Sequence, residues 1–486
     1  MRIWVFIVGL TLVAGLSFLG VPVHFDEAQY TTWLAHPDMS YQTKGPFVTF
    51  IQSLTHKQEF LPQLLQVRLP GWIAWGLSAG LMIWLGKLAG FDRESSRRLL
   101  ILFVTSPILL TIGMVHTTDI WLLFFMLLAF CAFASILHCR LNQHTELWWL
   151  VFGASLGLGA LAKLSIALVP LSILPWVFVR SPRLIFTPGP FLGGLLCVFI
   201  MTPWILWNVD NNFAHLAHEF GHIATGQYGL MQAITWIPLI LIASVPAMLL
   251  SLVGSFRLKI DDYVSEAEET VRDMLRFSFG SLLVFFVIKG LLGEVVLNWA
   301  LPVVPFVLMI FASRMRWSPQ NSLLAGLSQM LLLMVLIHPY ALGLGIKQDP
   351  FQKIRGWDNA IQEVVKLSGP TAVVTSDHYS ILAWALYFWP SESTGVARYV
   401  SPVGQVIPST TRRRNQYDNW SVLSREHSSL IHLGQYSEGL AKRCQELNKL
   451  GDVSQVMPDG TVRSTLGVYR CVRFIPNPDW PIINSR

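Results

Sequence analysis

The sequence predicts an α-helical membrane protein that crosses the bilayer many times and carries a soluble α/β domain at its C-terminal end. Of its 486 residues, 53% are hydrophobic and only 13% are charged, whereas a soluble globular protein carries roughly 25% charged residues. Long apolar stretches recur up to about residue 340, and the composition becomes charged after Pro339. One large soluble core is therefore excluded.

About eleven apolar stretches are long enough to cross a membrane, and each should be helical because lipid offers backbone polar groups no partner. They lie at 3–21, 64–90, 98–115, 118–138, 147–162, 164–180, 189–207, 232–254, 276–291, 295–313 and 320–340. The region 147–180 also fits one broken hairpin around Lys163. The first stretch resembles a signal peptide, but VPVHFDEA is a poor cleavage site, so we expect a retained span.

Lysine and arginine gather on one side of these spans. With a cytoplasmic N-terminus, the cytoplasmic ends hold Arg2, Lys87, Arg93, Arg97, Arg98, Arg140, Arg180, Arg183, Arg257, Lys259, Arg272, Arg276, Arg314 and Arg316. The outer side, before the tail, holds Lys44, Lys57, Arg68 and Lys289, and Lys163 is assigned to neither side. The positive-inside rule therefore places the loop of about 22–63, the segment 208–231 and the tail beyond 341 outside.

Two domains follow from this pattern: a transmembrane domain over 1–340 and a soluble α/β domain over 341–486. In the second, TAVVTS is typical of a strand and SILAWALYFW of a helix. In the outer loop, EAQYTTWLAHP and GPFVTFIQSLT predict amphipathic helices along the membrane surface. Cys444 and Cys471 either form one disulfide, if the tail is outside the cytoplasm, or stay free. No basic stripe with interleaved aromatic residues occurs, so we expect no nucleic-acid partner.

Three carboxylates stand where spans end on the predicted outer face. Asp26 and Glu27 follow the first span, and Asp119 lies between the third and the fourth, three residues after His116. A carboxylate beside lipid is costly unless it is solvated, paired or used in chemistry. Capping of a helix N-terminus is the alternative for each acid.

Lys44 and Arg68 fall on the same face as the acids, and this combination suits transfer from a phosphorylated donor. A carboxylate can take the proton of an acceptor hydroxyl or amine, and Lys or Arg can neutralise a leaving phosphate. Carboxylates can also hold a divalent metal ion, for which Asp26 and Asp119 are the candidate ligands. Snorkelling to lipid headgroups is the alternative for both cations.

His218, Glu219 and His222 fit the H-E-x-x-H pattern of zinc metalloproteases, in which two histidines bind zinc and the glutamate is the base. The pattern has few fixed positions and falls here in an outer loop, with no clear third ligand downstream. A histidine cluster that is structural or contacts substrate, with His116 nearby in the same role, is favoured. A zinc protease stays open as an alternative, as does a non-catalytic transporter, although the paired half-repeats of transporters are missing.

The order of several segments resembles the protein O-mannosyltransferase and aminoarabinose transferase superfamily, which has the GT-C fold. HFDEAQYTTWLAHPDMSYQTKGPFVTFIQSLT resembles the first outer loop of the family, VRLPGWI the start of its second span, and TTDIWLLFF its T-x-D-x-x-L-x-F-F segment. GLGALAKLS, TPWILWNVDNNFAHLAHEFGH, GEVVLNWALPVVP and RRRNQYDNW resemble segments usual in bacterial members. The resemblance runs along nearly the whole chain.

This resemblance implies a glycosyltransferase of the bacterial inner membrane that takes a sugar from a polyprenyl phosphate on the periplasmic face. It matches Asp26 to the catalytic acid, Glu27 to its partner and Asp119 to the second acidic site. It matches Lys44 and Arg68 to positions that hold the lipid-linked phosphate. The acceptor is a lipid, a glycan or a protein.

One departure from the family concerns the residues before the turn at Lys44. Members specific for aminoarabinose carry an acidic residue there, whereas this chain has Gln42-Thr43. If that acid binds metal in relatives, a divalent metal cofactor is in doubt here. The departure also argues against aminoarabinose as the sugar.

Overall fold

The structure is a computed structural model that describes residues 15–56, 58, 60–139, 145–221, 230–245, 265–314, 319–343, 347, 349–369, 373–389, 403–406, 416, 426–436 and 438–475. Its contacts divide the chain into two compact units. The first, termed the helical unit, comprises Met1–Leu16, Lys44–Val48 and Arg68–Met334. The second, termed the mixed unit, comprises Ser17–Thr43, Thr49–Val67 and Val335–Arg486.

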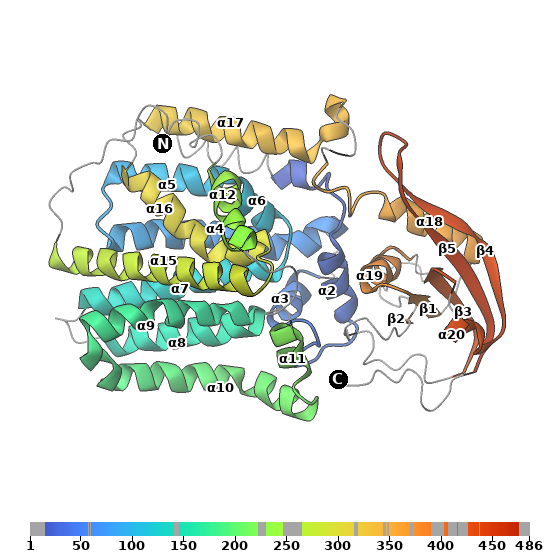
Figure 1. The fold of residues 1–486 in the computed structure, drawn as a ribbon, viewed down its shortest axis with the longest axis horizontal. Helices are drawn as coiled ribbons and strands as arrows, with labels where there is room; N and C mark the ends of the chain where they lie inside the picture. The colour runs from blue at the N-terminus through green and yellow to red at the C-terminus, as the bar shows by residue number, and fades with distance from the viewer. Residues whose placement is uncertain are drawn as a thin grey trace. The chain divides into compact units, whose positions relative to one another are not determined.

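The helical unit is built from helices, most of them long and apolar (Figure 1). They are α4 (Gln63–Leu88), α5 (Arg93–Thr105), α6 (Pro107–Met114), α7 (Thr118–His138), α8 (Thr145–Ala162), α9 (Leu168–Arg180), α10 (Pro188–Asp210), α11 (Ala214–Gly221), α12 (Leu230–Ser244), α15 (Glu266–Leu292), α16 (Val304–Arg314) and α17 (Pro319–Ile337). Among the described residues, six helices are long and apolar enough to cross a membrane, or seven if α5 and α6 form one bent span. The predicted multi-pass helical fold is confirmed, whereas the number of spans stays a prediction.

The predicted span 98–115 is broken rather than continuous. Helices α5 and α6 meet at Ser106 with an angle of 57° between them. Pro107 causes the break, because proline has no N–H to donate to the preceding turn and disfavours helical geometry at the residue before it. Ser106 accordingly has an extended backbone, with ψ of 119°.

A second break separates α8 from α9 and confirms the interruption expected at Lys163. Lys163 has extended backbone angles, with φ of −157° and ψ of 125°, and a 3-10 helix, η2 (Leu164–Ala167), leads into α9. A membrane helix tolerates such a break only where the freed backbone groups and the charge find partners in the protein. The break thus turns Lys163 into a residue held inside the helical unit.

Helices α7, α8 and α10 run side by side (Figure 1). Glycine allows α8 and α10 to approach closely: a Cβ on Gly153 would lie 2.0 Å from the carbonyl oxygen of Gly193. Small residues at a helix crossing are the usual means of tight packing in lipid, where apolar surface alone gives no drive to associate.

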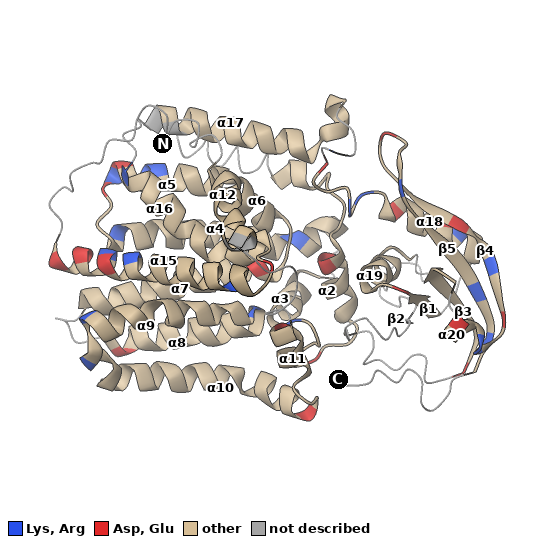
Figure 2. Ribbon diagram, viewed as in Figure 1, with Lys and Arg blue, Asp and Glu red and all other residues tan. Residues whose placement is uncertain are grey.

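Charged residues gather near one end of the helices of this unit (Figure 2). Three contacts there join loops that the sequence placed together on the cytoplasmic side: Arg180 pairs with Asp273 at 3.0 Å, Arg272 donates to Ala89 O, and Arg98 donates to Ala312 O. Glu266, Glu268 and Glu269 form the acidic first turn of α15. Which membrane face this end occupies stays a prediction.

The mixed unit contains a five-stranded sheet in the order β2-β1-β3-β5-β4. The strands are β1 (Val373–Ser376), β2 (Val403–Val406), β3 (His427–Gly434), β4 (Cys444–Val456) and β5 (Val462–Phe474). Strand β1 runs parallel to β2 and β3, whereas β5 is antiparallel to β3 and β4. Helix α18 (Trp357–Ser368) packs on β4, α19 (Tyr379–Phe388) packs on β1 and β2, and α20 (Glu438–Ala441) packs on β4.

The predicted strand and helix of the tail are therefore confirmed as β1 and α19. Cys444 and Cys471 are joined in a disulfide, with their Cα atoms 5.4 Å apart. Cys471 is fully buried beside Val373, Leu430 and Phe474 in the core of the unit.

The outer-loop helices are α2 (Phe25–Trp33) and α3 (Phe47–Thr55). By contacts, most of the loop groups with the tail in the mixed unit, and α2 is largely buried by protein. The boundary near residue 340 remains a prediction. Most of the first predicted span, the last part of 232–254, His222 and all of RRRNQYDNW except Gln416 lie outside the described residues.

Candidate active site

The two adjacent acids at the start of α2 have different surroundings. His24 is the N-cap, and Glu27 completes a capping box by accepting a hydrogen bond from the backbone N–H of His24 at 2.9 Å. Glu27 is fully buried, whereas the side chain of Asp26 remains 21% exposed. The capping alternative thus describes Glu27 but leaves the carboxylate of Asp26 available at the helix N-terminus, which favours negative charge.

Helix α19 holds the N-terminal end of α2. The Phe25 ring contacts Tyr379 and Trp384 edge-on, and the indole N–H of Trp384 donates to the carbonyl of Val23 at 3.1 Å. Burial raises the pKa of Tyr379, and the negative charge of Asp26 raises it further. Tyr379 therefore stays a neutral phenol beside Asp26 at physiological pH.

Asp119 lies in the helical unit, in the first turn of α7, and is part of a buried charge cluster. Its Oδ1 accepts from the Lys163 ammonium at 2.6 Å and its Oδ2 from the Asn298 amide at 3.2 Å. Thr117, rather than Asp119, is the N-cap of α7. Lys44 is close enough to Asp119 to interact electrostatically with it. One carboxylate and two lysines thus interact in this part of the helical unit.

The turn that carries Lys44 is fixed against the end of α8. A Cβ on Gly45 would lie 1.9 Å from the carbonyl oxygen of Leu161, two residues before Lys163. Phe47 follows the turn and packs edge-on against Trp121 and Phe125 of α7, with ring centroids 5.1 Å apart in both cases. This packing brings the loop lysine beside the break in the membrane helix.

Gly45→Ala is expected to displace Lys44 and to reduce activity by roughly 10-fold or more, because the clash is with backbone and a shift of about 1 Å at a catalytic group can cost about 100-fold. The measurement is the rate of sugar transfer in membranes, with protein level and melting temperature as references. Gly80→Ala in α4 is the matched control, since a Cβ there meets nothing within 4 Å. Equal activity of the two variants would contradict the expectation.

Arg68 and His116 are both completely buried. Burial excludes snorkelling to lipid headgroups as the role of the Arg68 guanidinium. The indole N–H of Trp121 donates to Nε2 of His116 at 3.0 Å, so His116 is an acceptor at that nitrogen. A contact between His116 and a substrate remains a prediction.

The H-E-x-x-H segment begins in α11. His215, which precedes it, is buried and accepts from the indole N–H of Trp204 at its Nδ1, 2.9 Å away. Burial first, and the positive charge of Lys44 second, together lower the pKa of His215 to about 3. His218 and Glu219 lie in α11, and the Glu219 carboxylate is 3.9 Å from Nε2 of His215.

The low pKa of His215 predicts a pH dependence of stability. The unfolded residue takes a proton near pH 6.5 and the folded one only near pH 3, so protons favour the unfolded state between these values. The stability that the folded protein gains from holding His215 neutral is fully present above pH 6.5. It is lost progressively as the pH falls toward 3. The melting temperature should therefore fall less between pH 7 and 4 in His215→Gln, which keeps an acceptor for Trp204. Parallel curves for the two proteins would refute this.

The residues around Asp119 do not fit a divalent metal ion. Both oxygens of its carboxylate already accept from Lys163 and Asn298. In the part of the chain that the structure describes, no group of three or more His, Cys, Asp or Glu side chains could hold a metal ion. The Lys163 ammonium lies beside the Asp119 carboxylate, where a metal cation would otherwise be expected.

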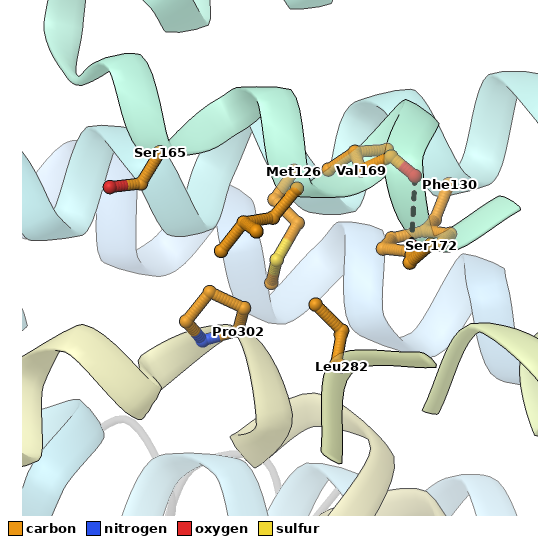
Figure 3. Close-up of a pocket in the computed structure, with 8 residues that line it drawn as sticks. Met126, Phe130, Ser165, Val169, Ser172, Leu282 and Pro302 are labelled. Atoms are coloured by element: carbon orange, nitrogen blue, oxygen red, sulfur yellow. Dashed lines mark hydrogen bonds between the residues drawn. The ribbon is translucent and has the colours of Figure 1, made fainter. Parts of the chain in front are cut away.

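A narrow cleft among α7, η2, α9, α15 and the 3-10 helix η4 (Leu297–Val303) has no part in this site (Figure 3). Its lining is mainly apolar, and Ser172 donates its hydroxyl to the carbonyl of Val169 at 2.8 Å. The cleft is too narrow to admit a water molecule.

The helical unit thus brings together Lys44 and Asp119, with Lys163 and Asn298 as residues that the sequence had not assigned to the site. A lysine inside an apolar stretch was the available signal for Lys163, and Asn298 lies in the segment GEVVLNWALPVVP. Asp26 and Glu27 belong to the mixed unit. Catalytic and phosphate-binding roles for these residues remain predictions.

Comparison with known proteins supports the resemblance drawn from the motifs. The family model described as dolichyl-phosphate-mannose-protein mannosyltransferase matches residues 43–207, which include Lys44, Arg68, Asp119 and Lys163. The fold is similar to that of ArnT from Cupriavidus metallidurans in the apo state, with a TM-score of 0.63 and 14% identity over 96% of this chain and 97% of that one. ArnT bound to undecaprenyl phosphate matches with a TM-score of 0.61, also at 14% identity and with the same coverage of both chains.

Proposed function

We propose that this multi-pass membrane protein, which is PMT-like in residues 43–207 and has the GT-C fold of ArnT, is a glycosyltransferase that uses a sugar linked to a polyprenyl phosphate. The observation that carries the proposal is the cluster of half-buried Lys44 and Lys163 with buried Asp119, together with buried Arg68, within the matched residues. Cations are held inside a membrane protein at a cost that function explains. The phosphate of a polyprenyl lipid is an anion that these cations would bind.

The reaction is a single displacement at the anomeric carbon. Asp26 takes the proton of an acceptor hydroxyl or amine, the acceptor atom forms a bond to the anomeric carbon, and the bond from that carbon to the phosphate oxygen breaks. The polyprenyl phosphate leaves with the electron pair, and the anomeric configuration inverts.

Positive charge at the phosphate favours departure of the leaving group. Lys44 and Arg68 are proposed to contact the phosphate oxygens. Lys163 neutralises Asp119, so that the carboxylate does not repel the phosphate. Fixed charges in a water-poor site are worth more than in water and need no reorganisation during the reaction.

The site is proposed to face the periplasm of a bacterial inner membrane. The Lys and Arg asymmetry supports this orientation. The disulfide between Cys444 and Cys471 supports it as well, because disulfides persist outside the reducing cytoplasm. Labelling of a single cysteine introduced at exposed Tyr436 by a membrane-impermeant maleimide in intact spheroplasts tests it, and protection until lysis would refute it.

Binding of undecaprenyl phosphate to the purified full-length protein tests the phosphate site. Wild-type protein should bind it, and Lys44→Met and Arg68→Met should each weaken binding roughly 10- to 100-fold, as expected for a lost charge-assisted hydrogen bond. Arg314→Met, at an exposed arginine at the end of α16, is the matched control and should bind normally. Failure of the wild-type protein to bind would overturn the proposed function.

Mass spectrometry identifies the product. Lipid A, glycans and glycoproteins from cells with and without the gene should differ by one sugar residue in one of these three classes. Identical profiles in all three classes, under conditions where the protein is present in the membrane, would contradict a glycosyltransferase.

A further inference from the structure

Lys289 is a buried cation of the helical unit that the proposed mechanism does not use. It lies in the last turn of α15, a helix long and apolar enough to cross a membrane, and is only 8% exposed. Protein therefore surrounds its ammonium group, which excludes snorkelling to lipid headgroups as its role. An ammonium group is kept in such a place at a considerable cost in desolvation, and function is the usual reason for it.

The contacts of Lys289 among the described residues do not balance its charge. Its Nζ donates to the backbone carbonyl of Glu294 at 2.9 Å and lies 5.1 Å from the centroid of the Trp299 ring. The carbonyl uses only one of the N–H donors of the ammonium group. No carboxylate in the described part of the chain forms an ion pair with Lys289, because that of Glu294 is exposed and interacts with it only at longer range.

The 3-10 helix η4 connects Lys289 to the charge cluster of the candidate site. Trp299, over whose ring the ammonium group lies, belongs to η4. The preceding residue, Asn298, donates its side-chain amide to Oδ2 of Asp119 at 3.2 Å. Two consecutive residues of η4 thus contact the unbalanced cation on one side and the carboxylate of the cluster on the other.

A purely structural role is the alternative for Lys289. The side chain reaches from the last turn of α15 to a carbonyl five residues later, so it could serve to close the turn between α15 and η4. A glutamine amide can donate the same hydrogen bond and has no charge to desolvate. The structural role therefore predicts that glutamine can replace Lys289, whereas binding of an anion requires the positive charge.

We propose that Lys289 binds a phosphate group of a substrate, as a third phosphate-binding cation of the helical unit beside Lys44 and Arg68. The inference rests on the proposed function. Phosphate supplies negative charge together with several acceptor oxygens for the remaining N–H donors of the ammonium group. Two substrates can carry this phosphate: the polyprenyl phosphate donor, or an acceptor that is itself phosphorylated.

The test measures the binding of undecaprenyl phosphate to the purified full-length protein and the rate of sugar transfer in membranes. Lys289→Gln keeps a donor for the carbonyl of Glu294 but removes the charge. It should weaken binding about 10-fold, which is the difference between a charged and a neutral hydrogen bond. Lys289→Arg keeps the charge and should bind within about 3-fold of the wild type. This pattern would assign Lys289 to the phosphate of the donor.

The transfer rate distinguishes the other source of the phosphate. If Lys289→Gln binds undecaprenyl phosphate normally but transfers sugar about 10-fold more slowly, and Lys289→Arg restores the rate, the phosphate belongs to the acceptor. Arg98→Gln is the matched control, since Arg98 is also buried but donates to Ala312 O at 2.9 Å and pairs with Glu94. It should lower the melting temperature and leave binding, and transfer per folded molecule, unchanged.

Two results would overturn the inference while the proposed function stands. One is binding and transfer in Lys289→Gln that equal those of the wild type, because a neutral donor would then suffice. The other is an equal loss in Lys289→Gln and Lys289→Arg, because the shape of lysine rather than its charge would then matter. By contrast, failure of wild-type protein to bind undecaprenyl phosphate would refute the proposed function, and this inference with it.

Discussion

Asp26→Asn is expected to reduce sugar transfer about 100- to 10,000-fold, the usual contribution of a positioned general base. Asparagine matches aspartate in size but cannot take the acceptor proton. Because Asp26 does not cap α2, the variant should fold normally and bind undecaprenyl phosphate like the wild type. The rate of transfer in membranes containing equal amounts of protein is the measurement.

Glu27→Gln is the matched control for this loss. The glutamate supports the N-terminus of α2 by accepting the backbone N–H of His24, and weakening a cap costs roughly 0.5–2 kcal/mol. This variant should therefore melt at a lower temperature and keep most of its activity per folded molecule. Full activity of a well-folded Asp26→Asn protein would eliminate the residue as the base.

Lys163→Met is expected to destabilise the protein by about 3–5 kcal/mol, the usual cost of leaving one member of a buried ion pair unpaired. The partner left behind is Asp119, whose side chain is only 10% exposed. The double variant Asp119→Asn, Lys163→Met removes both charges and should recover most of the melting temperature. Transfer should stay at least about 100-fold reduced, because the Asp119 carboxylate no longer holds the Lys44 ammonium in position.

The buried pair of Asp349 and Arg355 in the mixed unit serves as a control. It distinguishes a loss of stability from a loss of catalytic activity. Its side chains are 0% and 8% exposed, and Arg355 Nε donates to Asp349 Oδ2 at 2.8 Å. Breaking this pair should also destabilise, but Asp349→Asn with Arg355→Met should recover activity together with stability. If the double variant of Asp119 and Lys163 also regains the full rate of sugar transfer, the ion pair of Asp119 with Lys163 has a structural role only.

The long apolar stretches predicted the helices of the helical unit well, since apolar length is a strong signal in a membrane protein. The sequence analysis did not predict the bend at Ser106, although Pro107 could have indicated it. The stretch 98–115 has the length of one span and was therefore assigned as one helix. In the tail, TAVVTS and SILAWALYFW predicted β1 and α19. The pairing of β3 with β5 could not be predicted, because it depends on contacts between residues far apart in the sequence.

At the site, the sequence indicated Asp26, Asp119 and Lys44 but could not show their surroundings. The difference between Asp26 and Glu27 depends on the capping geometry at His24. The contact of Lys163 with Asp119 joins two spans, and no local pattern encodes it.

The capping box at the start of α2 gives the order of the two acids a meaning of its own. Glu27 builds the helix end, whereas Asp26, one residue earlier, is the proposed base. A protein with Asp26→Glu and Glu27→Asp would have the same composition and the same net charge. It would nevertheless place a longer side chain at position 26 and a shorter one at position 27, which completes the capping box. The Asp-Glu dipeptide is thus a directional element, and homologues that carry it reversed are expected to differ in mechanism rather than in substrate alone.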